Sequence, residues 1–332
     1  MERSRIPELD GLRGMAILAV VAWHYCGAIG TLGWLGVDLF FVLSGFLIGG
    51  ILIDAKGKPD YFRGFYRRRF FRIVPLYAAV FLVGLPLRSH LQLPVMPWHA
   101  YAFTANFWIM RHGWGAGRYL DVAWSLSSEE QFYLLLPAIV WATPRRWLLP
   151  VISAMMLASI LPSWRFFTLR CDGLLFGVFA AVVLRTRLRA SLEAHPGIIH
   201  GLLTAAGGVL GLSLLRASAP FLSFAASLLF LMAVVAVICN NHSLLAKACR
   251  APWLRWLGKV SYCVYLTHIQ LLRLAHSFLI GRFAVVAAAA AVLSLAALSW
   301  KYFESPLIEF ARRGHLPRGE NAFPAPVSVA VE

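Results

Sequence analysis

The stretch that decides the fold is residues 9–24, LDGLRGMAILAVVAWH, an apolar run with charged residues near its start and a histidine at its end. In a helix, Arg13 and His24 lie three turns plus about 20° apart, which is about 16 Å along one face. Asp10 precedes Arg13 by three residues and falls on the same stripe. Ionisable groups are costly in hydrocarbon, so we predict that this stripe faces a functional site. The alternative is a surface arginine with an incidental buried histidine.

The composition predicts an all-α bundle that crosses a membrane many times. Hydrophobic residues make up 60% of the 332, and the mean hydropathy is +0.70. Apolar runs of about 20 residues, long enough to span a bilayer, recur throughout the chain. We predict about ten transmembrane helices, over residues 12–29, 34–53, 74–90, 125–142, 147–163, 166–184, 198–215, 221–239, 257–279 and 283–303.

The charge pattern indicates topology rather than nucleic-acid binding. The net charge is +16, and the 31 basic residues lie mostly between the apolar runs, a placement typical of cytoplasmic loops and of contact with anionic membrane lipids. Most of them fall on one side only if the short apolar segment 97–111 does not cross. We therefore predict that both chain termini are cytoplasmic.

The rest of the chain gives little sign of further domains. We expect one membrane domain over residues 1–308 and a disordered cytoplasmic tail over residues 309–332, which is rich in proline. The five cysteines are scattered without a C-x-x-C pair, so neither a disulfide framework nor a metal site is expected.

Polar groups also enter the second and third predicted spans. Residues 36–46, GVDLFFVLSGF, carry Asp38 and Ser44; the small residues at 44 and 45 favour close helix packing, and a nucleophilic serine is the alternative. At the cytoplasmic end of the third span, Arg69 and Arg72 lie one turn apart. Part of that charge is a topology signal, but paired guanidinium groups on one face also suit phosphate oxygens.

Two adjacent carboxylates open the fourth span, in residues 123–133, AWSLSSEEQFY. Neighbouring helical side chains point about 100° apart, so only one of Glu129 and Glu130 is expected to serve a site, and either one fits. Counting the helical rise places Glu129 about 7 Å and His24 about 12 Å below the outer surface. An imidazole–carboxylate pair is therefore predicted, in which the carboxylate orients the ring.

Further polar residues are candidates without a fixed role. For Asp172 beside Arg170, a structural charge pair is as good an interpretation as a substrate contact. Ser261, Tyr265 and His268 lie at i, i+4 and i+7 and share a polar helix face. A satisfied structural histidine is the alternative for His268. The complete set of additional site candidates is Asp10, Asp38, Ser44, Trp124, Ser125, Arg170, Asp172, Tyr265, His268 and Glu304. Cations at the inner mouth, with titratable groups above them, suit an anionic cytosolic donor whose reactive end reaches an acceptor across the membrane.

Seven segments, taken together and in order, resemble the acyltransferase-3 family of integral membrane acyltransferases. The resemblance covers about residues 6–308. It is carried by LDGLRG with His24, FFVLSGF (40–46), RFFRIVP (69–75), WSLSSEEQFY (124–133), RCDGL (170–174), SYCVYLTH (261–268) and YFESP (302–306).

The resemblance implies transfer of an acyl group, often acetyl, from cytosolic acyl-CoA to a hydroxyl of a surface glycan or a lipid-linked saccharide in a bacterial inner membrane. It matches Arg13 and His24 to the family's R-x10-H pair, Arg69 and Arg72 to its RxxR element, and residues 124–130 to its W-S-L-x-x-E-E site. We expect His24 to act as general base or as an acyl relay, with acyl-CoA as the donor. A transporter or flippase for an acylated or polar solute is the alternative from another class.

Overall fold

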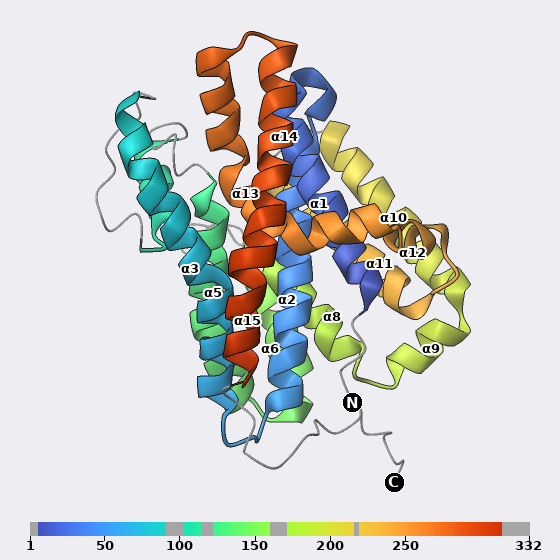
Figure 1. Cartoon of the computed structure of the whole chain (residues 1–332). Helices are drawn as coiled ribbons and strands as arrows, with labels where there is room; N and C mark the ends of the chain where they lie inside the picture. The colour runs from blue at the N-terminus through green and yellow to red at the C-terminus, as the bar shows by residue number, and fades with distance from the viewer. Residues whose placement is uncertain (1–5, 91–101, 114–121, 160–170, 216–218, 314–332) are drawn as a thin grey trace.

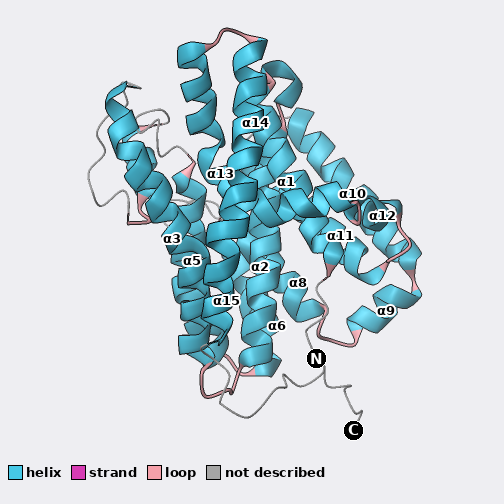
Figure 2. Cartoon of the chain, viewed as in Figure 1, coloured by secondary structure: helices cyan, strands magenta, loops and turns pink. Residues whose placement is uncertain are grey.

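The computed structural model describes residues 6–90, 102–113, 122–159, 171–215 and 219–313 (Figure 1). Every regular element within these ranges is helical (Figure 2), which confirms the predicted all-α class. The helices are α1 (Pro7–Tyr25), α2 (Gly36–Ala55), α3 (Tyr61–His90), α4 (Ala105–His112), α5 (Ala123–Ala142), α6 (Arg145–Ala158), α8 (Asp172–Val183), α9 (Leu188–Ala194), α10 (Pro196–Leu215), α11 (Ala219–Cys239), α12 (Leu244–Cys249), α13 (Pro252–Phe278), α14 (Arg282–Ser299) and α15 (Ser305–Arg313), the last two joined by a π-helical turn, Trp300–Glu304.

Helices α1, α2 and α13 lie in the middle of the bundle, with α3 and α5 to one side and α10 and α11 to the other (Figure 1).

Each of the ten predicted spans overlaps one of the helices. Four segments of the described chain are long and apolar enough to cross a membrane by themselves: Gly33–Ala55, Pro196–Leu215, Phe221–Cys239 and Arg282–Arg313. The number of crossings and the side on which the termini lie remain predictions.

Two boundaries differ from those expected. Helix α3 begins at Tyr61 rather than near residue 74, so the basic segment lies inside a continuous 30-residue helix and not before it. At about 1.5 Å per residue, α3 is about 45 Å long, more than a bilayer core requires. Helix α15 continues to Arg313, so the first residues of the predicted tail, 309–313, are helical. Residues 314–332 lie outside the described residues, and the predicted division at residue 308 remains a prediction. Residues 105–112 of the segment expected not to cross form α4.

Glycines allow the central helices to approach one another closely. A Cβ added at Gly45 would lie 2.0 Å from the carbonyl oxygen of Leu174 on α8, and one at Gly177 would lie 2.1 Å from that of Val42 on α2. The close packing predicted at residues 44–45 is therefore confirmed for α2 against α8. A Cβ at Gly258 on α13 would lie 1.8 Å from the Asp10 carbonyl oxygen on α1. This last contact holds α1 and α13, and hence their polar stripes, side by side.

Replacing Gly258 by alanine is expected to destabilise the protein, because the new methyl group overlaps the α1 backbone. Overpacking of this kind costs about 1–3 kcal/mol, to be measured as a lower midpoint of thermal unfolding in detergent. Gly201→Ala on α10, where no atom lies within 4 Å of the added Cβ, is the matched control. Equal midpoints for the two variants would show that the α1–α13 contact is not tight.

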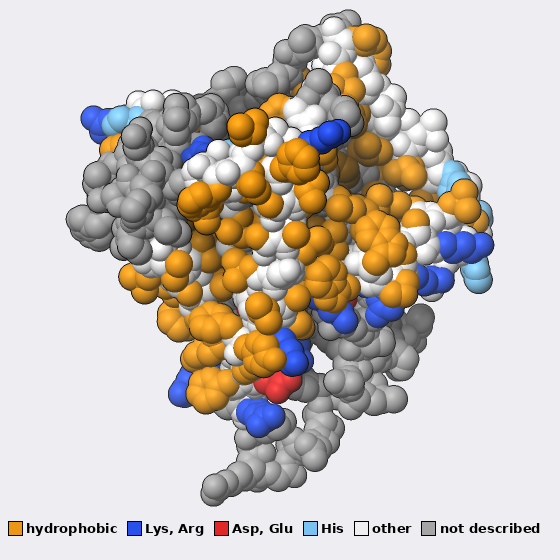
Figure 3. All heavy atoms as spheres, turned by 45° about the horizontal axis from the view of Figure 1, so that its top comes forward, with side chains coloured by type: hydrophobic (Ala, Val, Ile, Leu, Met, Phe, Trp, Pro, Cys, Tyr) orange, Lys and Arg blue, Asp and Glu red, His pale blue; other side chains and the backbone are white. Residues whose placement is uncertain are grey.

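Large apolar side chains cover the outside of the bundle. Leu134 and Leu135 on α5 and Trp147 on α6 are more than half exposed, as are Leu212 on α10 and Phe283 on α14. In the space-filling view, hydrophobic side chains form broad patches with basic groups at their margins (Figure 3). Patches of this extent fit contact with lipid tails rather than with water.

Candidate active site

The candidate site is built on the contact between α1 and α13. Arg13 Nη2 donates a 3.3 Å hydrogen bond to Ser261 Oγ, and His24 Nδ1 lies 3.2 Å from His268 Nε2. The polar stripe of α1 therefore meets the polar face of α13 at both ends. Tyr265 lies between Ser261 and His268 on α13, and its hydroxyl is 2.6 Å from Ser125 Oγ on α5.

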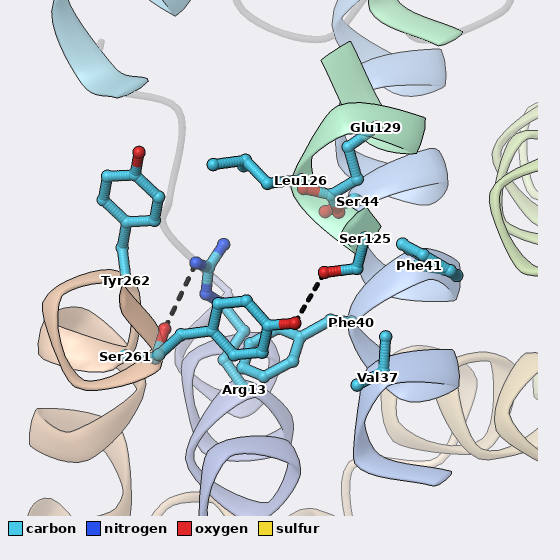
Figure 4. A pocket seen from close by; sticks show the side chains of 11 residues that line it. Arg13, Val37, Phe40, Phe41, Ser44, Ser125, Leu126, Glu129, Ser261 and Tyr262 are labelled. Carbon is cyan, nitrogen blue, oxygen red and sulfur yellow. Dashed lines mark hydrogen bonds between the residues drawn. The ribbon is translucent and has the colours of Figure 1, made fainter. Parts of the chain in front are cut away.

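A pocket opens beside Arg13 (Figure 4). It is lined by Arg13, Val37, Phe40, Phe41, Ser44, Ser125, Leu126, Glu129, Ser261, Tyr262 and Tyr265, which come from α1, α2, α5 and α13. The Glu129 carboxylate hydrogen-bonds the hydroxyls of Ser44 and Tyr133 and interacts with the guanidinium groups of Arg69 and Arg13. A carboxylate placed between two arginines balances charge that would otherwise be costly to bury.

The three predicted donor-binding arginines form one cluster. Arg72 interacts electrostatically with both Arg13 and Arg69, and with the carboxylate of Glu304. Aromatic rings support each guanidinium: Arg13 lies 5.9 Å from the centre of the Phe40 ring, Arg69 lies 5.0 Å from that of Tyr133, and Arg72 lies 5.6 Å from that of Trp300. Cation–π contacts of this kind hold a guanidinium in place without neutralising it, so the charge stays available to an anion.

Glu304 reaches this cluster from the π-helical turn between α14 and α15. It is 3% exposed, and Ser299 Oγ donates a 3.1 Å hydrogen bond to its Oε1. A π-helical turn of this kind inserts an extra residue into a helix and is frequent at functional sites. Its carboxylate interacts electrostatically with Arg72.

The predicted pairing of His24 with Glu129 is wrong. Glu129 contacts Arg13 and Arg69, at the opposite end of the α1 stripe from His24, and His24 contacts His268 instead. Counting the helical rise gives a position along one helix, but it does not show which residues of the neighbouring helices lie at the same level. Glu129 therefore lies among the arginines rather than in a separate layer above them.

The remaining candidates divide between this cluster and the surrounding packing. Asp10 and Glu130 interact with Arg13 and Arg69, respectively. Trp124 is buried and packs edge-on against Phe41, with ring centres 6.0 Å apart. Asp38 and Asp172 are buried where α2 meets α8, and neither lines the pocket. Arg170 lies outside the described residues.

Several site residues were not among the predicted ones. Ser261 holds Arg13, and Tyr133, Phe40 and Trp300 support the guanidinium groups. The sequence contained a pattern that could have identified two of them. Tyr133 follows Glu129 by one helical turn, and Ser261 begins the polar face that includes Tyr265. Phe40 on α2 and Trp300 in the π-helical turn carried none, because only tertiary contact shows which arginine they cover.

Replacing Glu129 by glutamine should lower stability, because Arg13 and Arg69 then lose their compensating charge. Loss of one partner of a buried pair costs about 3–5 kcal/mol, to be measured by thermal unfolding in detergent. Glu309→Gln, which breaks an exposed pair with Arg313 on α15, is the control and should cost less than about 1 kcal/mol. Equal losses would contradict the assigned contacts.

Comparison with known proteins shows the family to which the chain belongs. A family model described as an acyltransferase domain, that of the acyltransferase-3 family, matches residues 6–301. The chain belongs to this family. With its long apolar helices, it is an integral membrane protein.

The curated relatives that the chain resembles are O-acetyltransferases by name. The chain is 28% identical to the peptidoglycan O-acetyltransferase OatA of Listeria monocytogenes, over 92% of this chain and 56% of the relative. It is 30% identical to the putative peptidoglycan O-acetyltransferase YrhL of Bacillus subtilis, over 91% and 55%, and 25% identical to the O-acetyltransferase OatA of Staphylococcus aureus, over 98% and 61%. The chain thus spans little more than half the length of these relatives. No solved structure matches it.

Proposed function

We propose that the protein is an O-acyltransferase that moves an acetyl group from cytosolic acetyl-CoA to a hydroxyl of a glycan outside the bacterial inner membrane. The observation that carries this proposal is the α1 stripe. One end of this stripe, at Arg13, lies in a cluster of three arginines, and the other end is His24. Membership of the acyltransferase-3 family and the names of the relatives support the same chemistry.

The arginine cluster suits the phosphates of CoA. Guanidinium groups bind phosphate oxygens with paired, charge-assisted hydrogen bonds, and Arg13, Arg69 and Arg72 converge from α1 and α3. Arg13 and His24 lie about 16 Å apart along α1, a distance that an extended pantetheine arm can span. Phosphates held at the cluster would therefore bring the thioester to the level of His24.

The proposed reaction requires one base. His24 takes the proton of the acceptor hydroxyl as its oxygen attacks the thioester carbonyl carbon. The carbon–sulfur bond then breaks, and the proton passes from His24 to the CoA thiolate, so the products are an ester and free CoA. Glu129 serves the donor end in this scheme by holding Arg13 and Arg69. An acyl-histidine relay is the variant in which His24 itself attacks the thioester.

The proposal is tested by supplying acetyl-CoA labelled in the acetyl group to inside-out vesicles that contain the protein. We expect base-labile label in a glycan or a lipid-linked saccharide inside the vesicles, where its mass spectrum identifies the acceptor. Vesicles without the protein control for background transfer. Movement of a solute that continues in His24→Ala vesicles, without any label on an acceptor, would favour the transporter instead.

A further inference from the structure

The second histidine of the pair, His268 on α13, is fully buried, whereas His24 at the end of α1 is exposed at the surface of the bundle. Their ring centres are 4.9 Å apart, with the planes at 64°. The Tyr25 hydroxyl, next to His24, donates a 2.9 Å hydrogen bond to the His268 carbonyl oxygen. The two rings are therefore held together by side-chain and backbone contacts between the same two helices.

The neighbours of His268 determine which of its nitrogens carries the proton. Its Nδ1 lies 2.7 Å from the Tyr265 carbonyl oxygen and 3.2 Å from that of Val264. Carbonyl oxygens only accept hydrogen bonds, so Nδ1 carries the hydrogen. In the neutral ring, Nε2 then has a lone pair, and this is the atom that faces His24.

The same reasoning applies to His24. Its Nδ1 lies 2.9 Å from the Val20 carbonyl oxygen and 3.2 Å from His268 Nε2. Both neighbours are acceptors, so Nδ1 of His24 carries a hydrogen and shares it between them. The lone pair of His24 is consequently on Nε2, the nitrogen that a general base needs for the acceptor hydroxyl.

We propose that His268 is a positioning residue, whose Nε2 accepts the Nδ1–H of His24 and thereby keeps His24 Nε2 as the base of the transfer reaction. This inference rests on the proposed function, since it assumes that His24 is that base. When His24 takes up the proton of the acceptor hydroxyl, its ring becomes an imidazolium. The bond from Nδ1–H to His268 is then charge-assisted and strengthens as the reaction proceeds. His268 thus orients His24 by accepting its Nδ1–H, as a carboxylate does for other catalytic histidines.

Two amide substitutions separate this role from packing. His268→Gln places an amide oxygen close to the original position of Nε2 and can still accept from His24. His268→Asn has the same group one carbon shorter and cannot reach it. We expect the turnover number of the glutamine variant to stay within about 5-fold of wild type and that of the asparagine variant to fall about 10- to 100-fold, as for loss of a hydrogen bond to a charged group. The KM for acyl-CoA should stay unchanged in both.

His276→Asn is the structural control, because His276 is exposed about two turns further along α13 and makes the same one-turn bond to a carbonyl oxygen. Its turnover number should match that of the wild type even if its unfolding midpoint falls. Equal turnover numbers for the glutamine and asparagine variants would overturn the proposal, since an acceptor at the Nε2 position would then be irrelevant.

A spectroscopic measurement tests the same point without relying on activity. In histidine-labelled protein in bilayers, the His24 ring resonances are assigned by their loss in His24→Ala. We expect a hydrogen on His24 Nδ1, with a proton shift that moves in His268→Asn and is restored in His268→Gln. His276, which makes the same bond to the carbonyl one turn earlier, serves as the internal reference. A His24 ring whose Nδ1 carries no hydrogen would refute the inference. Acyl transfer that survives His24→Ala would instead refute the proposed role of His24 as the base.

Discussion

Replacing His24 by alanine should lower acyl transfer by about 10²- to 10⁴-fold, the usual contribution of a general base. The substitution should lower the turnover number and leave donor binding intact, because the contacts proposed for the donor phosphates lie about 16 Å from His24 along α1. CoA binding, measured by calorimetry on the purified protein, should therefore stay close to the wild-type value. The combination of intact binding with lost turnover would identify His24 as a residue of the chemical step.

The control for this variant is His276→Ala. His276 lies near the end of α13, is exposed, and makes the same one-turn bond to a carbonyl oxygen as His24 does. Its loss should leave transfer unchanged. Full activity in the His24 variant would show that His24 is not the general base. Equal losses of activity in both variants would indicate a general structural effect.

Replacing Arg69 or Arg72 by glutamine should raise the KM for acyl-CoA by about 10- to 100-fold, the loss expected when charge-assisted hydrogen bonds to phosphate are removed. Lysine should not restore the wild-type KM, because a point charge cannot make paired bonds to a phosphate. The turnover number at saturating donor should change far less. Initial rates over a range of acyl-CoA concentrations separate the two constants.

Arg67→Gln is the matched control on the same helix. Arg67 donates a 3.3 Å hydrogen bond to the Phe310 carbonyl oxygen on α15 and stacks on the Phe310 ring. It lies outside the cluster that contains Arg13, and its loss should leave the KM unchanged. An equal rise in KM for all three variants would mean that the basic segment attracts CoA only through its overall charge.

Helical periodicity and polar residues in apolar runs were enough to predict much of this arrangement. The spacing of Arg13 and His24 placed them on one stripe, and the i, i+4, i+7 spacing of Ser261, Tyr265 and His268 predicted the face that meets it. These predictions succeeded because they depend only on positions within one helix.

Contacts between helices were harder to predict. The estimate that paired His24 with Glu129 counted depth along two separate helices and could not show which residues of those helices meet. The start of α3 was missed for another reason, since its basic residues are stabilised by partners such as Glu129 and by aromatic rings from other helices. Sequence spacing also could not show that His268 lies against His24, since α1 and α13 are separated by most of the chain.

The most direct test of the account is a cryo-EM structure of the protein with a thioether analogue of acetyl-CoA. We predict that the phosphates lie within hydrogen-bonding distance of Arg69 and Arg72, and that the analogue's carbonyl lies beside His24 Nε2. An analogue bound with its carbonyl away from His24, or with its phosphates away from the arginine cluster, would contradict the account.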